Sequence, residues 1–223
     1  MADRLPPIPE GQMTSGLSAT SATTEPLGRE LADLASVLRQ STVEVRTGGT
    51  GSGSGIIWTA NGLIVTNAHV ARTERAAIIL WDGRTFDGVV TARDPRRDLA
   101  TIAIDVGSAI LPAAAIGHPT DLRTGDVVVA LGNPLGIAGA LALGVVHVVE
   151  QRRGGPRWIR ADIRLAPGNS GGPLADAHGR VVGVNTLIAN GLGVAVPVTT
   201  VARFLGDAEV ERANVKYRGD RAA

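Results

Sequence analysis

The chain has 223 residues, enough for one large β-domain or two small ones around real hydrophobic cores. Apolar residues make up 44% and charged residues 19% of it, a balance that excludes wholesale disorder. The net charge of +1 gives no electrostatic reason to expect nucleic acid or an anionic membrane as partner, and we expect neither. The sequence holds no cysteine, so it has no disulfide or thiolate–metal framework, and we expect neither a metal nor another cofactor.

The first residues differ in character from the rest. Residues 1–41 contain no apolar core of signal-peptide length, and no later run reaches membrane-spanning length, so we expect a cytoplasmic protein. Residues 1–27 are rich in Pro, Ser, Thr and Gly and predict a flexible N-terminal arm. Leucines at helical spacing then predict a short helix over 28–39.

From residue 41 onward the pattern is typical of strands. Abundant glycine (29 residues) and 3% aromatics favour an all-β chain with tight turns. Two runs of strands, separated by a Pro- and Gly-punctuated stretch, predict two six-stranded antiparallel β-barrels over 28–111 and 112–206, with a terminal helix and a polar tail at 207–223. The expected strands are 42–46, 54–58, 63–66, 76–80, 85–91 and 99–104 in the first run, and 126–131, 144–150, 158–164, 173–175, 180–185 and 193–196 in the second.

The most specific string is PGNSGGP, residues 167–173. A serine hydroxyl is a poor nucleophile unless its backbone is held exposed beside a base. The flanking glycines permit a tight turn that brings a substrate close and aims the N–H groups of Gly168 and Ser170 at one point. This favours Ser170 as a nucleophile with an oxyanion hole. The alternative is a glycine-rich surface turn with an idle serine.

The sequence has four histidines, and one has a distinctive setting. His69, in VTNAHV, follows the second strand of an expected hairpin and is flanked by small residues that leave space around its ring. His118 lies in the linker, His147 inside an apolar strand and His178 at a turn, so we expect these three to be surface or packing residues.

Asp98 opens a strand that reads as buried, within RRDLATIAI. A carboxylate is seldom placed at the end of an apolar strand without a partner. Asp98 could accept the Nδ1–H of His69 and so fix the tautomer of that base. It could equally be a strand-start aspartate bonded to local backbone.

Taken together, the order His, Asp, Ser in the contexts TNAHV, DLA and GNSGGP resembles the trypsin-like (chymotrypsin-fold) serine proteases, specifically the HtrA (Deg) branch. The strings ALGNPLG at 130–136 and GVNTLI at 183–188 are similar to the same branch. The resemblance covers about residues 30–206. It implies a double β-barrel serine endopeptidase that cleaves through an acyl-enzyme. The catalytic triad would be His69, Asp98 and Ser170, and the oxyanion hole would comprise Gly168, Asn169 and Ser170.

The resemblance also implies where a substrate side chain binds. The P1 pocket would be lined by Leu165, Thr186, Ile188 and Ala189, with no carboxylate among them. This predicts small or medium aliphatic P1 residues, in unfolded or flexible protein segments. Leu165 and Ile188 could instead be barrel core.

Several departures from the branch affect regulation. Only about seventeen residues follow the last expected helix, so we expect no PDZ domain. The N-terminal segment lacks the aromatics that make trimer contacts in the branch, which leaves monomer or trimer open. Asn169 stands where many digestive relatives have aspartate, so activation by N-terminal clipping is not expected, and ordering of the loop at 152–158 is the favoured control.

Two alternatives to a trypsin-like protease have some support in the sequence. The string around Ser170 also satisfies the G-x-S-x-G elbow of α/β-hydrolases, but Gly171-Gly172-Pro173 follows where that fold needs a helix. Only His178 lies downstream of the serine, too close for that topology. The second rival, a proteolytically silent protease-like fold acting as a peptide-binding or chaperone module, stays open.

Overall fold

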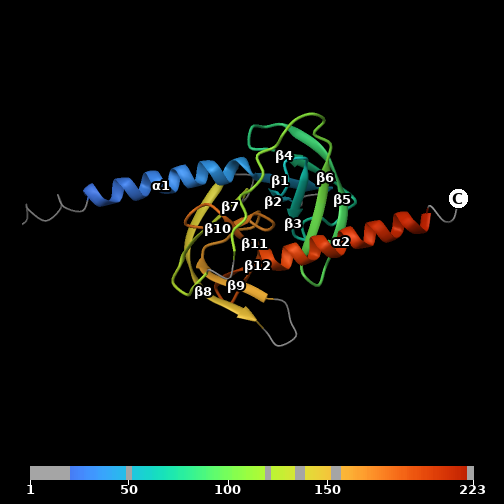
Figure 1. Cartoon of the computed structure of the whole chain (residues 1–223). Helices are drawn as coiled ribbons and strands as arrows, with labels where there is room; N and C mark the ends of the chain where they lie inside the picture. Colours follow the sequence, from blue (N-terminus) through green and yellow to red (C-terminus); the bar gives the residue numbers. More distant parts are fainter. Residues whose placement is uncertain (1–20, 49–51, 119–121, 134–138, 152–156, 220–223) are drawn as a thin grey trace, which may run out of the picture. The chain divides into compact units, whose positions relative to one another are not determined.

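The computed structural model describes residues 21–48, 52–118, 122–133, 139–151 and 157–219. The chain divides into two compact units, residues 1–33 and 34–223. Within the described residues of the second unit, the strands close into two six-stranded antiparallel barrels (Figure 1). The predicted all-β double barrel is therefore confirmed.

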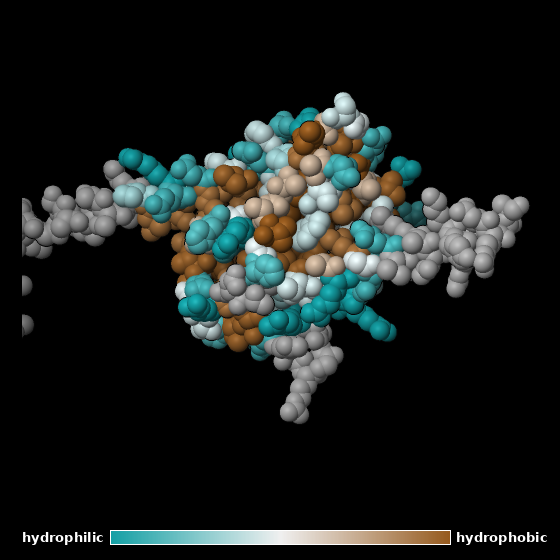
Figure 2. Space-filling model, in the orientation of Figure 1, coloured by the Kyte–Doolittle hydropathy of each residue, from teal (hydrophilic) through white to brown (hydrophobic). Residues whose placement is uncertain are grey.

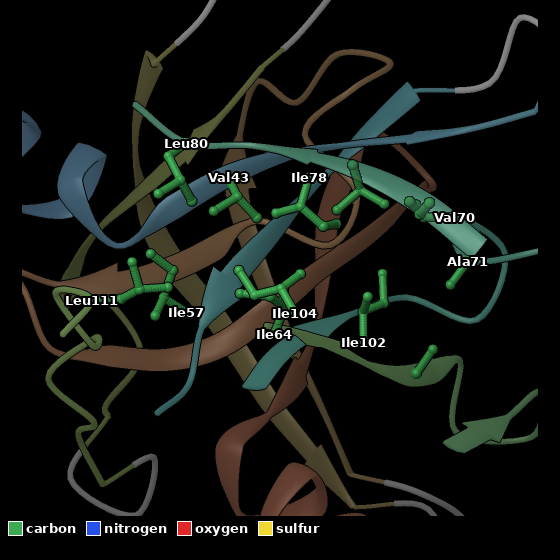
Figure 3. Close-up of a cluster of buried hydrophobic side chains, with 13 residues drawn as sticks. Val43, Ile57, Ile64, Val70, Ala71, Ile78, Leu80, Ile102, Ile104 and Leu111 are labelled. Carbon is green, nitrogen blue, oxygen red and sulfur yellow. The ribbon is translucent and has the colours of Figure 1, made fainter. Parts of the chain in front are cut away.

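The first barrel has the strand order β1-β2-β3-β6-β5-β4. Its buried apolar side chains meet in one cluster, shown in Figure 3, and Phe86 and Val90 of β5 pack against that cluster. On β1 the alternation is clear, because Val43 and Val45 are fully buried while Arg46 between Val45 and Thr47 is exposed. The strands are β1 (Thr42–Thr47), β2 (Ser52–Ile57), β3 (Leu63–Thr66), β4 (Arg75–Ile79), β5 (Thr85–Asp94) and β6 (Leu99–Ile104).

The second barrel is also closed and six-stranded, with the strand order β10-β11-β12-β9-β8-β7. Its core is built mostly from small and β-branched residues, including Val128, Val146 and Val182. The hairpin between β11 and β12 turns at Asn190-Gly191, and both residues have a positive φ, as a tight turn requires. The strands are β7 (Val127–Gly132), β8 (Ala140–Gln151), β9 (Arg157–Ile163), β10 (Pro173–Asp176), β11 (Val181–Ala189) and β12 (Leu192–Pro197).

The two helices are longer than the sequence predicted. The first, α1 (Ser21–Gln40), begins before residue 28, so residues 21–27 are helical. Pro26 lies past the first turn of this helix, where a proline removes one i→i−4 hydrogen bond, so its presence argues against a helix in the sequence. The second, α2 (Val198–Gly219), continues through most of the expected tail. It packs on β11 and β12, and Val198, Val201 and Phe204 near its start are buried.

The two barrels meet along β1 and β2 on one side and β7 on the other. A hydrogen bond crosses this junction from the N–H of Ser54 to the carbonyl of Ser170, at 2.8 Å. The molecular face in Figure 2 mixes hydrophobic and hydrophilic residues. In the described part of the chain, neither helix is long and apolar enough to cross a membrane.

Candidate active site

The sheet pairing of the first barrel places His69 and Asp98 together. Strand β3 ends at Thr66, which pairs with Ala100 near the start of the antiparallel β6. Residues just after β3 therefore lie beside residues just before β6. The chain after β3 makes a turn in which the N–H groups of Val70 and Ala71 both donate to the carbonyl of Asn67. This turn projects His69 from the barrel end, with 41% of its side chain exposed.

Asp98 adopts an unusual backbone conformation at this end of the barrel. Its φ is +53°, in the left-handed region that few residues other than glycine, asparagine and aspartate enter. The buried amide of Asn67 donates to the Asp98 carbonyl at 2.8 Å and holds the backbone there. The bend aims the carboxylate back at the turn that carries His69.

The carboxylate of Asp98 receives hydrogen bonds from two sides. His69 Nδ1 lies 2.8 Å from Oδ2 and 3.0 Å from Oδ1, and the His69 backbone N–H donates to Oδ1 at 3.1 Å. The Thr186 hydroxyl, from the second barrel, donates to Oδ2. Burial raises the pKa of Asp98, but these donors outweigh burial and hold that pKa below its ordinary value. Ionised Asp98 fixes the Nδ1–H tautomer of His69, which leaves Nε2 to accept a proton.

Ser170 lies in a tight turn between β9 and β10. The N–H of Asn169 donates to Ala166 O and the N–H of Gly172 donates to Asn169 O, each at 3.0 Å. Gly168 and Gly171 have φ of +104° and +85°, which a side chain would strain. The turn thus depends on the glycines that flank the serine.

The Ser170 hydroxyl donates to the backbone carbonyl of Thr186 at 2.9 Å. Within the described residues it makes no hydrogen bond to His69. Thr186 therefore contacts both the acid, through its hydroxyl, and the serine, through its carbonyl. A rotation about the Ser170 Cα–Cβ bond would be needed to turn the hydroxyl toward the imidazole.

Two backbone donors at this turn are available to a ligand. Among the described residues, neither the N–H of Gly168 nor that of Ser170 donates to a protein oxygen. The expectation for Asn169 needs correction, because its N–H is already donated to Ala166 O and its side chain is buried. Of the three predicted residues, Gly168 and Ser170 are the two whose N–H groups have no protein acceptor among the described residues.

A pocket opens beside Ser170, and its walls are mainly apolar. Of the predicted substrate-binding residues, Leu165, Thr186 and Ile188 line it, whereas Ala189 does not. Ala189 instead pairs with Leu192 at the end of the β11–β12 hairpin, one residue too far along the strand. The full lining is Leu165, Ala166, Pro167, Asn169, Ser170, Thr186, Leu187 and Ile188.

The comparison with known families agrees with this geometry. The family model of the trypsin-like peptidase domain matches residues 53–184, more than half of the chain and the span that carries His69, Asp98 and Ser170. The chain belongs to the trypsin-like peptidase family.

Relatives of this trypsin-like chain are serine proteases of the HtrA type. The putative serine protease HhoA of Synechocystis is 40% identical over 159 residues, which is 66% of this chain and 40% of that protein. The mitochondrial serine protease HTRA2 of Bos taurus is 39% identical over 163 residues, 69% of this chain and 35% of that protein. The chain thus spans about two fifths or less of the length of these relatives.

Solved structures of the HtrA-type protease AlgW share the fold. With a bound tripeptide, AlgW superposes with a TM-score of 0.73 at 31% identity, covering 78% of this chain and 62% of that one. With a decapeptide, the TM-score is 0.71 at 27% identity, covering 79% and 66%.

Within this trypsin-like chain, the structure brings His69, Asp98 and Ser170 to one junction and leaves the other histidines away from it. His118, His147 and His178 are all exposed. In the described residues, no cluster of His, Asp or Glu could hold a metal ion.

The sequence did not predict three hydrogen bonds that hold the site together. They join Thr186 to the Asp98 carboxylate, Asn67 to the Asp98 carbonyl and Ser54 to the Gly168 carbonyl. The sequence could have pointed to Asn67 only through its position two residues before His69 in VTNAHV, and to Ser54 only through its position between two glycines of β2. Neither string shows that the polar side chain makes a hydrogen bond to a distant segment.

Proposed function

We propose that this chain is a serine endopeptidase that hydrolyses peptide bonds through His69, Asp98 and Ser170. The observation that carries the proposal is the Asp98–His69 pair at 2.8 Å, joined through Thr186 to a serine beside two backbone N–H groups that have no acceptor among the described residues. Each part has the chemistry that acyl transfer requires: an oriented base, a nucleophile and an oxyanion site.

The reaction would begin with a rotation of the Ser170 hydroxyl from the Thr186 carbonyl to His69 Nε2. Ser170 Oγ attacks the scissile carbonyl carbon while His69 takes its proton, and ionised Asp98 stabilises the imidazolium. The carbonyl oxygen becomes an oxyanion against the N–H groups of Gly168 and Ser170, a contribution of about 3 kcal/mol per donor in such sites. His69 then protonates the leaving amine, and water repeats the attack on the acyl-enzyme.

The pocket beside Ser170 supports a preference for small or medium aliphatic P1 side chains. Its described lining contains no carboxylate to pair with Lys or Arg. Leu187 and Ile188 are about half exposed at its rim and offer apolar contact to a passing chain. An unfolded or flexible segment suits this open site, because the substrate must present its backbone to Ser170. A library cleavage profile dominated by basic P1 residues would contradict this preference.

One observation favours a second candidate, a proteolytically silent peptide-binding module. The Ser170 hydroxyl is bonded to Thr186 O and not to His69, which is an unactivated arrangement. Labelling with a fluorophosphonate probe separates the two. Wild-type labelling that disappears in Ser170→Ala, together with cleavage of an unfolded protein, supports the peptidase. An unlabelled wild type that still binds peptide supports the module.

A further inference from the structure

Ser54, on β2 of the first barrel, holds three backbone groups of the second. Its side chain is fully buried. Its hydroxyl donates to the carbonyl of Gly168 at 2.7 Å and accepts the N–H of Asn133 at 2.9 Å. Its own N–H donates to the carbonyl of Ser170 at 2.8 Å. The two carbonyls that Ser54 fixes thus belong to the same residues whose N–H groups are unpaired.

The consequence follows from the planarity of the peptide unit. A hydrogen bond at each end of a peptide plane prevents that plane from turning. The Gly168–Asn169 plane is held by Ser54 Oγ at its carbonyl and by Ala166 O at its N–H. The Ser170–Gly171 plane is held by the Ser54 N–H at its carbonyl and, at its N–H, by the Asn185 carbonyl at 2.8 Å.

The plane before Gly168 is different. It carries the first proposed oxyanion donor, and within the described residues its N–H has no partner. Gly168 lacks a side chain that would restrict rotation, so the direction of this N–H depends on how the next plane is fixed. That next plane is the one that the Ser54 hydroxyl holds.

We propose that Ser54 is a positioning residue for the oxyanion hole, a role that rests on the proposed peptidase function. Its hydroxyl sets the Gly168–Asn169 plane and thereby the direction in which the Gly168 N–H points. Removal of the hydroxyl leaves the carbonyl of Gly168 and the N–H of Asn133 without this partner. The Gly168 turn can then relax away from the geometry that an oxyanion needs.

The packing around Ser54 leaves little space for a replacement partner. A Cβ added to Gly132 would lie 3.0 Å from Ser54 Oγ, and one added to Gly172 would lie 3.1 Å from Ser54 Cβ. A Cβ on Gly171 would overlap the Ser54 carbonyl oxygen. Two glycines therefore close around this side chain and a third around its backbone carbonyl, and a water molecule needs more room than such contacts leave.

The test compares Ser54→Ala with Thr101→Val. Thr101 is a matched control because it is also buried in the first barrel, but its hydroxyl bonds to the Thr91 hydroxyl at 2.9 Å. Steady-state kinetics on a peptide with an aliphatic P1 residue are measured with inhibition by a peptide trifluoromethyl ketone, whose hemiketal oxyanion occupies the hole. For Ser54→Ala we expect kcat to fall by at least about tenfold with KM changed by less than about twofold. Ketone affinity should weaken by the same factor as kcat/KM, while Thr101→Val leaves both unchanged.

An unchanged kcat in a folded Ser54→Ala protein would overturn the positioning role, as would equal losses in both variants. If Ser54→Ala does not fold, Ser54→Cys, whose thiol is a weaker donor than the hydroxyl, replaces it under the same expectation. Failure of the peptidase proposal looks different, because the wild type itself would then show neither turnover nor labelling by the fluorophosphonate probe.

Discussion

The hydroxyl of Thr186 donates a hydrogen bond to the carboxylate of Asp98, and the two residues lie in different barrels. Asp98 precedes β6 of the first barrel, and Thr186 belongs to β11 of the second. The same Thr186 accepts the Ser170 hydroxyl at its carbonyl. One residue thus ties the position of the acid to that of the serine, so the relative placement of the barrels sets the geometry of the site.

Asp98→Asn should reduce kcat by about 10⁴-fold, the size of effect found when a triad aspartate loses its charge. The amide would favour the wrong tautomer of His69 and could not stabilise the imidazolium. Asp82→Asn is the control, because Asp82 bonds to Arg84 in a turn of the first barrel away from the site. Kinetics on one peptide substrate check both variants, and a loss below about tenfold in Asp98→Asn would rule out the orienting role.

The lowered pKa of Asp98 predicts how stability depends on pH. The folded protein binds this proton less tightly than the unfolded chain, whose carboxyl has the ordinary pKa of 3.8. Asp98 therefore contributes stability above that pH, and the contribution is lost as the pH falls through the lower folded-state pKa. Urea unfolding of wild type and Asp98→Asn from pH 7 to pH 3 measures it. As the pH falls below about 4, wild type should lose unfolding free energy relative to Asp98→Asn, because only wild type has this carboxylate to protonate; a difference that does not change in acid contradicts the prediction.

Leu165→Ala should widen the P1 preference toward large apolar side chains. Leu165 lines the pocket, and a Cβ added to Gly193 would lie 3.1 Å from the Leu165 side chain. Gly193 therefore has no side chain that could fill the space left when Leu165 is shortened. We expect kcat/KM for an aromatic P1 residue to rise relative to that for valine by about tenfold. Leu111→Ala, in the core of the first barrel, should lower stability and leave this ratio unchanged. A profile identical to wild type would remove Leu165 from the specificity pocket.

The fold was predictable because its signals are local. Short apolar runs between glycine and asparagine turns marked all twelve strands, and β11 and β12 turn at Asn190-Gly191, a signal of the same kind as Asn61-Gly62 earlier in the chain. The ends of the helices were not predictable in this way. Pro26 masked the start of α1, and the polar residues after Leu205 masked the continuation of α2.

The candidate site likewise has residues that the sequence could predict and contacts that it could not. His69, Asp98 and Ser170 lie in distinctive strings, so the sequence could nominate them. The contacts of Ser54 and Thr186 join residues that are 114 and 88 positions apart, and no local pattern encodes such pairs. The availability of backbone N–H groups is also set by the folded turn, which is why Asn169 was included among the oxyanion donors and has to be removed.

Asn67→Leu should impair the site through the backbone of Asp98. The fully buried amide of Asn67 donates to the Asp98 carbonyl at 2.8 Å and supports a φ of +53°. Leucine has a similar size but no donor, so the carbonyl loses its partner, at a cost of about 1–3 kcal/mol in unfolding free energy. The released backbone can leave the left-handed region, which turns the carboxylate away from His69 and lowers kcat. Asn67→Gln, which keeps the amide, should lose less activity than Asn67→Leu at equal stability. Equal kcat in wild type and Asn67→Leu would show that the conformation of Asp98 does not depend on this hydrogen bond.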